Sequence, residues 1–324
     1  MARFPYSILL ALALAALPAI AADATLLAKA EKGDAGAQFK LGMECYDGTG
    51  GNRDRATAAT WFRKAADHGD AKAQAKLGSM YAHGEGLPPD YAQALNWLRK
   101  AADQGNAAAE SDLGELYANG WGVPRNNVTA FKLFKKSAKH GYARGQYNLA
   151  AMYADGLGVE RDSAETVKWY RKAADQGLAD AWSRIGLLHT VGFGVAKDEA
   201  AALKCFQVAA DKGSAEAENN LGWAYANGNG VEKDLSKAVT WYLKAAVQGW
   251  PAAQANLGSV YAGGELKPRS RIEGLAWLIL AAESGNATFI KTRDELEHHM
   301  GSGPIATAHK RSEEIRKEIA AARE

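Results

Sequence analysis

The sequence lacks the short motifs by which many enzymes and cofactor-binding proteins are recognised. It has no GxSxG nucleophile elbow, no HExxH zinc motif, no glycine-rich phosphate loop and no CxxC pair. No candidate nucleophile has an evident partner base, and the carboxylates fall mostly at predicted helix caps or solvent-facing positions. We therefore predict that the chain is not an enzyme and that it binds no cofactor and no metal ion.

Net charge and proline content are also low. The 324 residues contain 39 Lys and Arg against 37 Asp and Glu, so neither a broad basic face nor a nucleic-acid partner is expected. Only 8 residues are proline, whereas 34 are glycine. This composition favours closely packed helices that end at glycine.

Long apolar runs are absent except near the N-terminus. After Arg3 the segment SILLALALAALPAIA is apolar, and Ala19-Ile20-Ala21 fits the small-x-small pattern of a cleavage site. The run is shorter than the roughly 20 residues of a spanning helix, which argues against the alternative of an uncleaved anchor. We predict a signal peptide over residues 1–21, no membrane span after cleavage and a periplasmic location, with secretion from the cell as the alternative.

What the sequence does have is a repeat. The pair Leu-Gly, or a close variant, recurs every 36 residues. The leading residues of the series are Leu41, Leu77, Leu113, Leu149, Ile185, Leu221 and Leu257. A strict period of this length indicates a solenoid, in which each unit covers the apolar face of its neighbours.

Each repeat has the pattern of two helices joined by a short turn. In the second repeat Ala73, Leu77 and Tyr81 form one stripe, and Gly84 is a predicted left-handed cap. Asp90 is expected to cap the second helix. The corresponding residues in four other repeats are Asp54, Asp162, Asp198 and Asp234. The second helices carry a predicted buried stripe of Trp61, Trp97, Trp169, Trp241 and Trp277, with Leu133 and Cys205 as departures.

These residues resemble a known repeat. The pattern LGxxYxxGxGVxxD…AxxWxxKAAxxG, with instances such as LGWAYANGNGVEKD, resembles the Sel-1-like repeat, a relative of the tetratricopeptide repeat. The resemblance covers about residues 24–285. It implies an all-α fold, a right-handed α-solenoid superhelix of seven 36-residue helix-turn-helix repeats, whose members serve as adaptors in protein complexes.

Both ends of the array are atypical. Residues 22–33 match the second half of a repeat and are expected to form an N-terminal half-repeat helix before the array at 34–285. Residues 286–324 are expected to form capping helices, the last with Ile305, Ile315 and Ile319 on one face. A coiled-coil dimer is the alternative, but three isoleucines give too short a seam, so we expect a monomer.

The two cysteines, Cys45 and Cys205, replace the recurrent tyrosine and tryptophan of repeats one and five. Because four repeats separate them, no intramolecular disulfide is expected, and both are predicted to be small buried residues. Some cysteine-rich members of the family are described as penicillin-binding or β-lactamase proteins, but they carry a cysteine pair in each repeat, which this chain lacks. His189 adds only a second metal-ligating side chain to Cys205, where a site needs three or four.

A partner is expected on the first helices. Positions two before and two after the repeat leucine share one face, which lines a concave groove if the superhelix matches its relatives. The groove candidates are Phe39, Glu115, Tyr147, Leu187, Asn219 and Trp223. Four of them, from Tyr147 to Trp223, form a predicted aromatic and amide patch suited to an extended peptide. The alternative for each is partial burial against the neighbouring repeat.

Two aromatic residues occupy one slot of the connecting loops. Trp121 and Phe193 lie between the loop glycines, where other repeats have Thr49, Glu85 or Asn229. Since the fold does not require an aromatic there, both are candidates for a contact surface. Packing between repeats is the alternative.

The sequence therefore predicts a non-enzymatic scaffold or adaptor in the cell envelope that binds a protein or peptide in the concave groove. A periplasmic regulator of a sensor kinase would use the same groove and is an alternative. A β-lactamase-like protein or cell-wall hydrolase is the alternative from another class.

Overall fold

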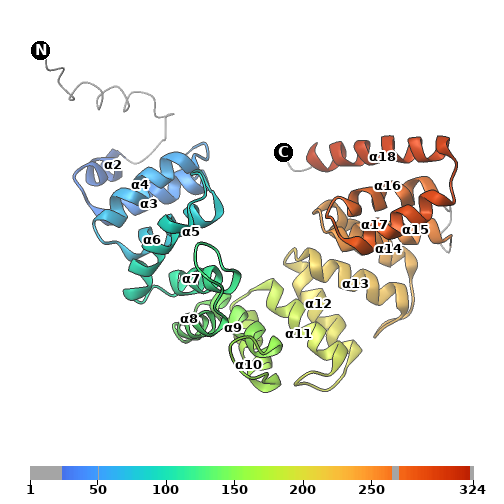
Figure 1. Ribbon diagram of the computed structural model, residues 1–324, viewed down its shortest axis with the longest axis horizontal. Helices are drawn as coiled ribbons and strands as arrows, with labels where there is room; N and C mark the ends of the chain where they lie inside the picture. Colours follow the sequence, from blue (N-terminus) through green and yellow to red (C-terminus); the bar gives the residue numbers. More distant parts are fainter. Residues whose placement is uncertain (1–23, 50, 265–269, 322–324) are drawn as a thin grey trace, which may run out of the picture. The chain divides into compact units, whose positions relative to one another are not determined.

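A computed structural model describes residues 24–49, 51–264 and 270–321. Within these ranges every regular element is an α-helix, from α2 to α18 (Figure 1), which confirms the predicted all-α solenoid. The chain divides into two compact units, with unit 1 ending at Arg161 and unit 2 beginning at Asp162. The predicted signal peptide lies outside the described residues. None of the described helices combines the length and apolar character that crossing a bilayer requires.

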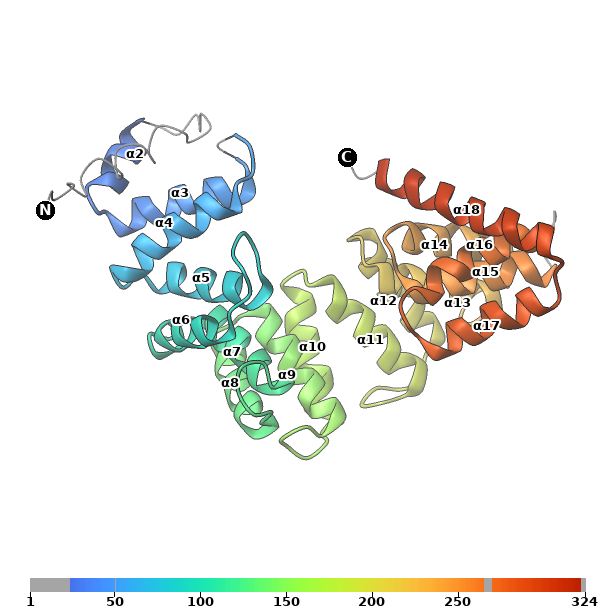
Figure 2. The ribbon, with the colours of Figure 1, turned by 45° about the horizontal axis from the view of Figure 1, so that its top comes forward.

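The helices alternate between first and second helices of successive repeats. Unit 1 contains α2 (Ala24–Glu31), α3 (Ala35–Asp47), α4 (Arg55–Asp67), α5 (Ala71–His83), α6 (Tyr91–Asp103), α7 (Ala107–Asn119), α8 (Asn127–Lys139) and α9 (Ala143–Asp155). Unit 2 contains α10 (Ser163–Asp175), α11 (Ala179–Val191), α12 (Glu199–Asp211), α13 (Ala215–Asn227), α14 (Leu235–Val247), α15 (Pro251–Gly263), α16 (Arg271–Ala282), α17 (Ala287–His298) and α18 (Ser302–Ala321). In both units a second helix packs against the first helix that follows it, as α4 does on α5 (Figure 2).

Side-chain caps fix where the second helices begin. The Asp90 carboxylate accepts hydrogen bonds from the backbone N–H groups of Ala92 and Gln93 at 2.9 and 3.0 Å. The other four predicted aspartate caps are confirmed in the same way. The first helices end at glycine, and Gly84 has φ +70°, a conformation that L side chains rarely adopt.

Close contact between the two helices of a repeat depends on the Leu-Gly pair. Leu77 is completely buried, and a Cβ added at Gly78 would lie 2.7 Å from Cγ of Leu98 on α6. The bare glycine therefore lets the second helix approach. On that second helix Trp97 is buried, and Nζ of Lys100 lies 4.3 Å from its ring centroid.

The predicted tryptophan stripe is mostly buried. Four of its members are buried, namely Trp61, Trp97, Trp169 and Trp277. Trp241 is half-buried, as is Leu133 at the same position of α8. Cys45 and Cys205 are both buried free thiols, and burial raises the pKa of each.

A polar ladder that the sequence analysis missed also joins the repeats. Nε2 of Gln38 donates to the Ala30 carbonyl oxygen at 2.9 Å, at the end of the preceding second helix. Gln74, Gln146 and Gln254 donate to the residue eight places earlier in the same way. Two repeats have a glutamate here, Glu110 and Glu218, which cannot donate when ionised.

The last helices depart from the repeat. In α17, Arg293 and Asp294 occupy the register positions of Leu257 and Gly258 one period later, and no residue of α17 is fully buried. Helix α18 turns back onto α16, where Ala308, Ser312 and Ile315 are buried. The packing of α18 therefore covers apolar surface that another repeat would otherwise cover.

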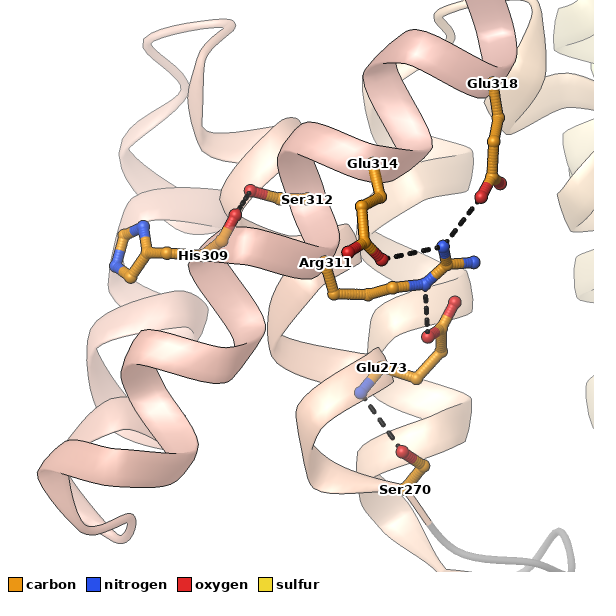
Figure 3. A network of polar contacts seen from close by, with 7 residues as sticks. All are labelled: Ser270, Glu273, His309, Arg311, Ser312, Glu314 and Glu318. Atoms are coloured by element: carbon orange, nitrogen blue, oxygen red, sulfur yellow. Dashed lines mark hydrogen bonds and ion pairs between the residues drawn. The ribbon is translucent and has the colours of Figure 1, made fainter.

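A charged network accompanies this packing (Figure 3). Nε of Arg311 on α18 lies 3.1 Å from Oε2 of Glu273 on α16. Its Nη1 also binds Glu318 at 2.8 Å and Glu314 at 3.5 Å within α18. The network joins the terminal helix to the array through one residue.

Candidate partner-binding surface

The candidate surface is the first-helix face, formed by side chains just before and after the repeat leucine on helices α3, α5, α7, α9, α11, α13 and α15. The position directly before that leucine is polar in all seven repeats. Its residues are Lys40, Lys76, Asp112, Asn148, Arg184, Asn220 and Asn256. This row was missed in the sequence analysis, although its strict polarity is a signal that the sequence contains.

In unit 1 the first-helix face is charged. Asp112 on α7 is half-buried, and the Ser79 hydroxyl of α5 donates to its carboxylate. Burial and the negative charge of Glu115 raise the pKa of Asp112 to about 6, against the opposing effects of His83, Ser79 and Lys76. The carboxyl group therefore changes charge near neutral pH.

A lysine whose charge acts weakly on this group, Lys76, is also partly buried. Nζ of Lys76 lies 3.5 Å from the ring centroid of Tyr46, and burial lowers the pKa of Lys76. The Tyr46 hydroxyl donates to Oε2 of Glu85 at 2.5 Å, and Glu85 faces Arg55 at 3.7 Å. The charged side chains of Lys76, Glu85 and Arg55 are thus all engaged in contacts within unit 1.

The predicted groove residues of unit 1 are also engaged by neighbours. Oε1 of Glu115 accepts from Nδ2 of Asn148 at 2.9 Å. The half-buried ring of Phe39 packs on Phe62, with centroids 5.6 Å apart. Tyr147 is half-buried, and the Arg144 guanidinium lies 5.7 Å from its centroid. All three belong to unit 1 and make intramolecular contacts.

The first-helix face of unit 2 has an exposed tryptophan, paired amides and an ion pair in which Arg184 lies 3.3 Å from Glu216. Trp223 on α13 is 45% exposed. One turn earlier on α13, Oδ1 of Asn219 accepts from Nδ2 of Asn256 on α15 at 2.9 Å. Leu187 on α11 is half-buried and packs on the core of α12 and α13. Unit 2 therefore contains three of the four residues of the predicted patch, and Tyr147 belongs to unit 1.

The exposure of Trp223 is not a requirement of the fold. The same position in the other repeats holds Met43, Ser79, Glu115, Ala151, Leu187 and Ser259. Small and charged side chains are thus tolerated where this repeat exposes a large aromatic. Exposed aromatic surface of this kind is typical of contact sites.

The two loop aromatics differ in exposure. Trp121 is 37% exposed, and its ring stacks on Tyr91 at the start of α6, with centroids 5.9 Å apart. Phe193 is half-buried. For Trp121 the structure thus shows packing between repeats together with a partly exposed edge.

Candidate metal ligands do not gather in the described part of the chain. Across residues 24–49, 51–264 and 270–321, no three His, Cys, Asp or Glu side chains are grouped so that they could hold a metal ion. Nδ1 of His189 lies 3.2 Å from the Ala196 carbonyl oxygen in its own loop.

Comparison with known families and structures identifies the repeat. Seven consecutive segments match the Sel1 repeat: 35–70, 71–106, 107–142, 143–178, 179–214, 215–250 and 251–286. The chain belongs to the Sel1 repeat family. Sel1 repeat proteins are generally protein-interaction scaffolds, a non-catalytic type of fold.

Two solved structures are similar over most of the chain. One is a protective antigen present in uropathogenic Escherichia coli strains, with 32% identity and a TM-score of 0.77; the match covers 92% of this chain and 64% of that one. The other is a Sel1 repeat protein from Oxalobacter formigenes, with 35% identity and a TM-score of 0.63; it covers 84% of this chain and 78% of that one. This chain thus spans less than two thirds of the E. coli protein. No curated protein matches the chain.

Proposed function

We propose that this chain is a non-enzymatic scaffold of the cell envelope that binds a protein or peptide on the first-helix face of unit 2. The exposed Trp223 carries the proposal, because it places a large aromatic on a position where the fold accepts serine or alanine. Buried aromatic anchors dominate binding energy at protein interfaces. Asn219 and Asn256 add amide groups that suit the backbone of an extended peptide.

An envelope location is part of the proposal and rests on two observations. Residues 1–21 have the composition of a signal peptide. The similar E. coli protein is described as a protective antigen, which fits an exported protein. Fusion of residues 1–30 to a reporter that is active only after export tests this location. Reporter activity should be lost when charged residues interrupt the apolar run.

Site-specific photocrosslinking in the native envelope tests the binding surface. A photoreactive residue at Ser259, the exposed position of α15 that corresponds to Trp223, should capture a partner. The matched control is Ser236, which is exposed on the second helix α14. We expect a crosslinked band at position 259 that is absent at position 236 and lost when Trp223→Ala is added. A band that persists with Trp223→Ala would contradict this assignment.

A further inference from the structure

The second helices expose a stripe on the side that faces away from the first helices. In α8 this stripe consists of Val128, Lys132, Lys135, Lys136 and Lys139, and all five residues are exposed. We call it the α8 stripe. Its lysines lie on one side of a single helix, and those at 132 and 139 are separated by about 10 Å along the axis.

The same five positions on the other second helices carry a smaller net charge than on α8. On α4 they hold Ala56, Thr60, Arg63, Lys64 and Asp67, and on α6 they hold Ala92, Asn96, Arg99, Lys100 and Asp103. Helices α4 and α6 thus have two cations and one aspartate there, and α10 has three cations, Lys168, Arg171 and Lys172, with Asp175. Helix α8 has four lysines, and its sequence NVTAFKLFKKSAK contains no acidic residue.

Ionic and ring contacts within the described part of the fold involve only two of the four lysines, Lys135 and Lys136. Nζ of Lys136 lies 3.9 Å from the buried Glu110, and Lys135 lies 5.6 Å from the Phe131 centroid. Lys132 stands where α4 and α6 have an uncharged residue, and Lys139 stands where they have an aspartate. Within the described residues neither lysine forms an ion pair. Like charges on neighbouring turns repel one another, so an external anion would stabilise the stripe.

Two features of the stripe distinguish between classes of anionic partner. The stripe contains lysine and no arginine. The lysine ammonium group is a hydrated point charge, whereas the arginine guanidinium group can form two parallel hydrogen bonds with one carboxylate. The stripe also includes Val128, whose side chain is 52% exposed. Diffuse positive charge beside an apolar side chain suits a surface of lipid headgroups better than a single acidic peptide.

We propose that the α8 stripe binds unit 1 to the surface of an anionic phospholipid bilayer. Within unit 1 the first-helix face lies on the other helix of each repeat, so the α8 stripe does not include it. A lysine near an anionic surface increases membrane partitioning about fivefold. Loss of three lysines should therefore weaken binding on the order of a hundredfold.

Sedimentation with vesicles tests the proposal. The chain from Ala22 onward is used, because it contains every described helix and lacks the apolar run that would itself bind lipid. The vesicles are phosphatidylcholine, alone or with about a third phosphatidylglycerol. We expect binding only to the anionic vesicles, at low salt, and release at high salt. The triple variant K132Q/K135Q/K139Q should bind about a hundredfold more weakly, and K132E/K135E/K139E should bind more weakly still.

The matched control makes the same change in net charge elsewhere. K204E/K212E/K317E replaces three exposed lysines of unit 2 and should bind like the unchanged chain. Circular dichroism must show equal helix content in all variants. Absence of binding by the unchanged chain, equal binding to uncharged vesicles, or equal loss in the control would each overturn the proposal. So would soluble polyglutamate binding that is as tight and as dependent on the stripe, because it would assign an acidic protein instead.

Discussion

The first-helix faces of the two units are built from the same repeat but differ in what they leave unpaired. In unit 1, Asp112, Lys76 and Glu115 interact with side chains of neighbouring repeats. In unit 2, the corresponding face has an amide pair, the Arg184–Glu216 ion pair and an exposed Trp223. The polar groups named in unit 1 are engaged within the array, whereas Trp223 of unit 2 is exposed surface that the array does not need.

The charged face of unit 1 carries a cost that the face of unit 2 avoids. A carboxyl group that is partly buried beside another carboxylate is destabilised in its charged form. Trp223 imposes a different cost, the exposure of a large apolar ring to water. Substitutions in the two units can separate these effects.

The largest effect is expected for Asp112→Asn in unit 1. The pKa of Asp112 rises from 3.8 to about 6 on folding, so the folded chain binds this proton more tightly than the unfolded chain. Its contribution is therefore favourable below about pH 4 and is lost as the pH rises through about 6. At pH 7 the charged form costs on the order of 3 kcal/mol, and Asp112→Asn should recover much of this.

Urea unfolding of both proteins between pH 4 and pH 8 checks this prediction, with hydrogen exchange of α7 reporting on unit 1. The difference between the two proteins should grow with pH, because the other titrating groups are common to both. Lys76, His83 and Glu115 face the same carboxyl group and stay unchanged in the comparison. A difference that is constant with pH would contradict the shifted pKa.

Trp223→Ala in unit 2 should have the next largest effect, and it acts on binding instead of stability. An aromatic anchor at an interface commonly contributes at least 2 kcal/mol, or about thirtyfold in affinity. Tyr147→Ala in unit 1 should change affinity less than threefold, because its ring is half-buried in intramolecular contacts. Titration of each variant with the partner captured at position 259 measures both. A larger loss for Tyr147→Ala would reverse the comparison between the units.

The sequence was sufficient to predict features that depend on a single repeat. Caps such as Asp90 and the close approach at Gly78 follow from local spacing. The ion and amide networks could not be predicted, because contacts such as that of Asn148 with Glu115 join residues of different repeats. Their geometry depends on how consecutive repeats stack, which the period alone does not fix.

The division into two units was also not predicted. It falls within the fourth repeat, the only repeat with alanine, Ala150, in place of the glycine of the Leu-Gly pair. The 36-residue period runs through the fourth repeat without interruption, so it contains no signal of the division.

The smallest effect is expected in the glutamine ladder, where the two units again differ. Glu218 in unit 2 lies where four other repeats have a glutamine that donates to the preceding helix, and burial raises its pKa. Glu218→Gln should add this donor and keep an oxygen that accepts from Gln248, now at 2.7 Å, but it loses the attraction to Lys244. We therefore expect unit 2 to be stabilised by up to about 1 kcal/mol at pH 7. The gain should shrink towards low pH, because protonated Glu218 can itself donate and its raised pKa favours that form.

Glu110→Gln in unit 1 is the matched substitution and should behave differently. Oε2 of Glu110 lies 2.8 Å from Nδ1 of His140, and Lys136 lies 3.9 Å from Oε1. The glutamine would gain the same donor but lose these charge interactions, so we expect little change or a small loss of stability. Thermal unfolding of both variants at pH 5 and pH 7 tests the pair. Equal gains would mean that the contacts of Glu110 with Lys136 and His140 contribute nothing to the difference between the two ladder positions.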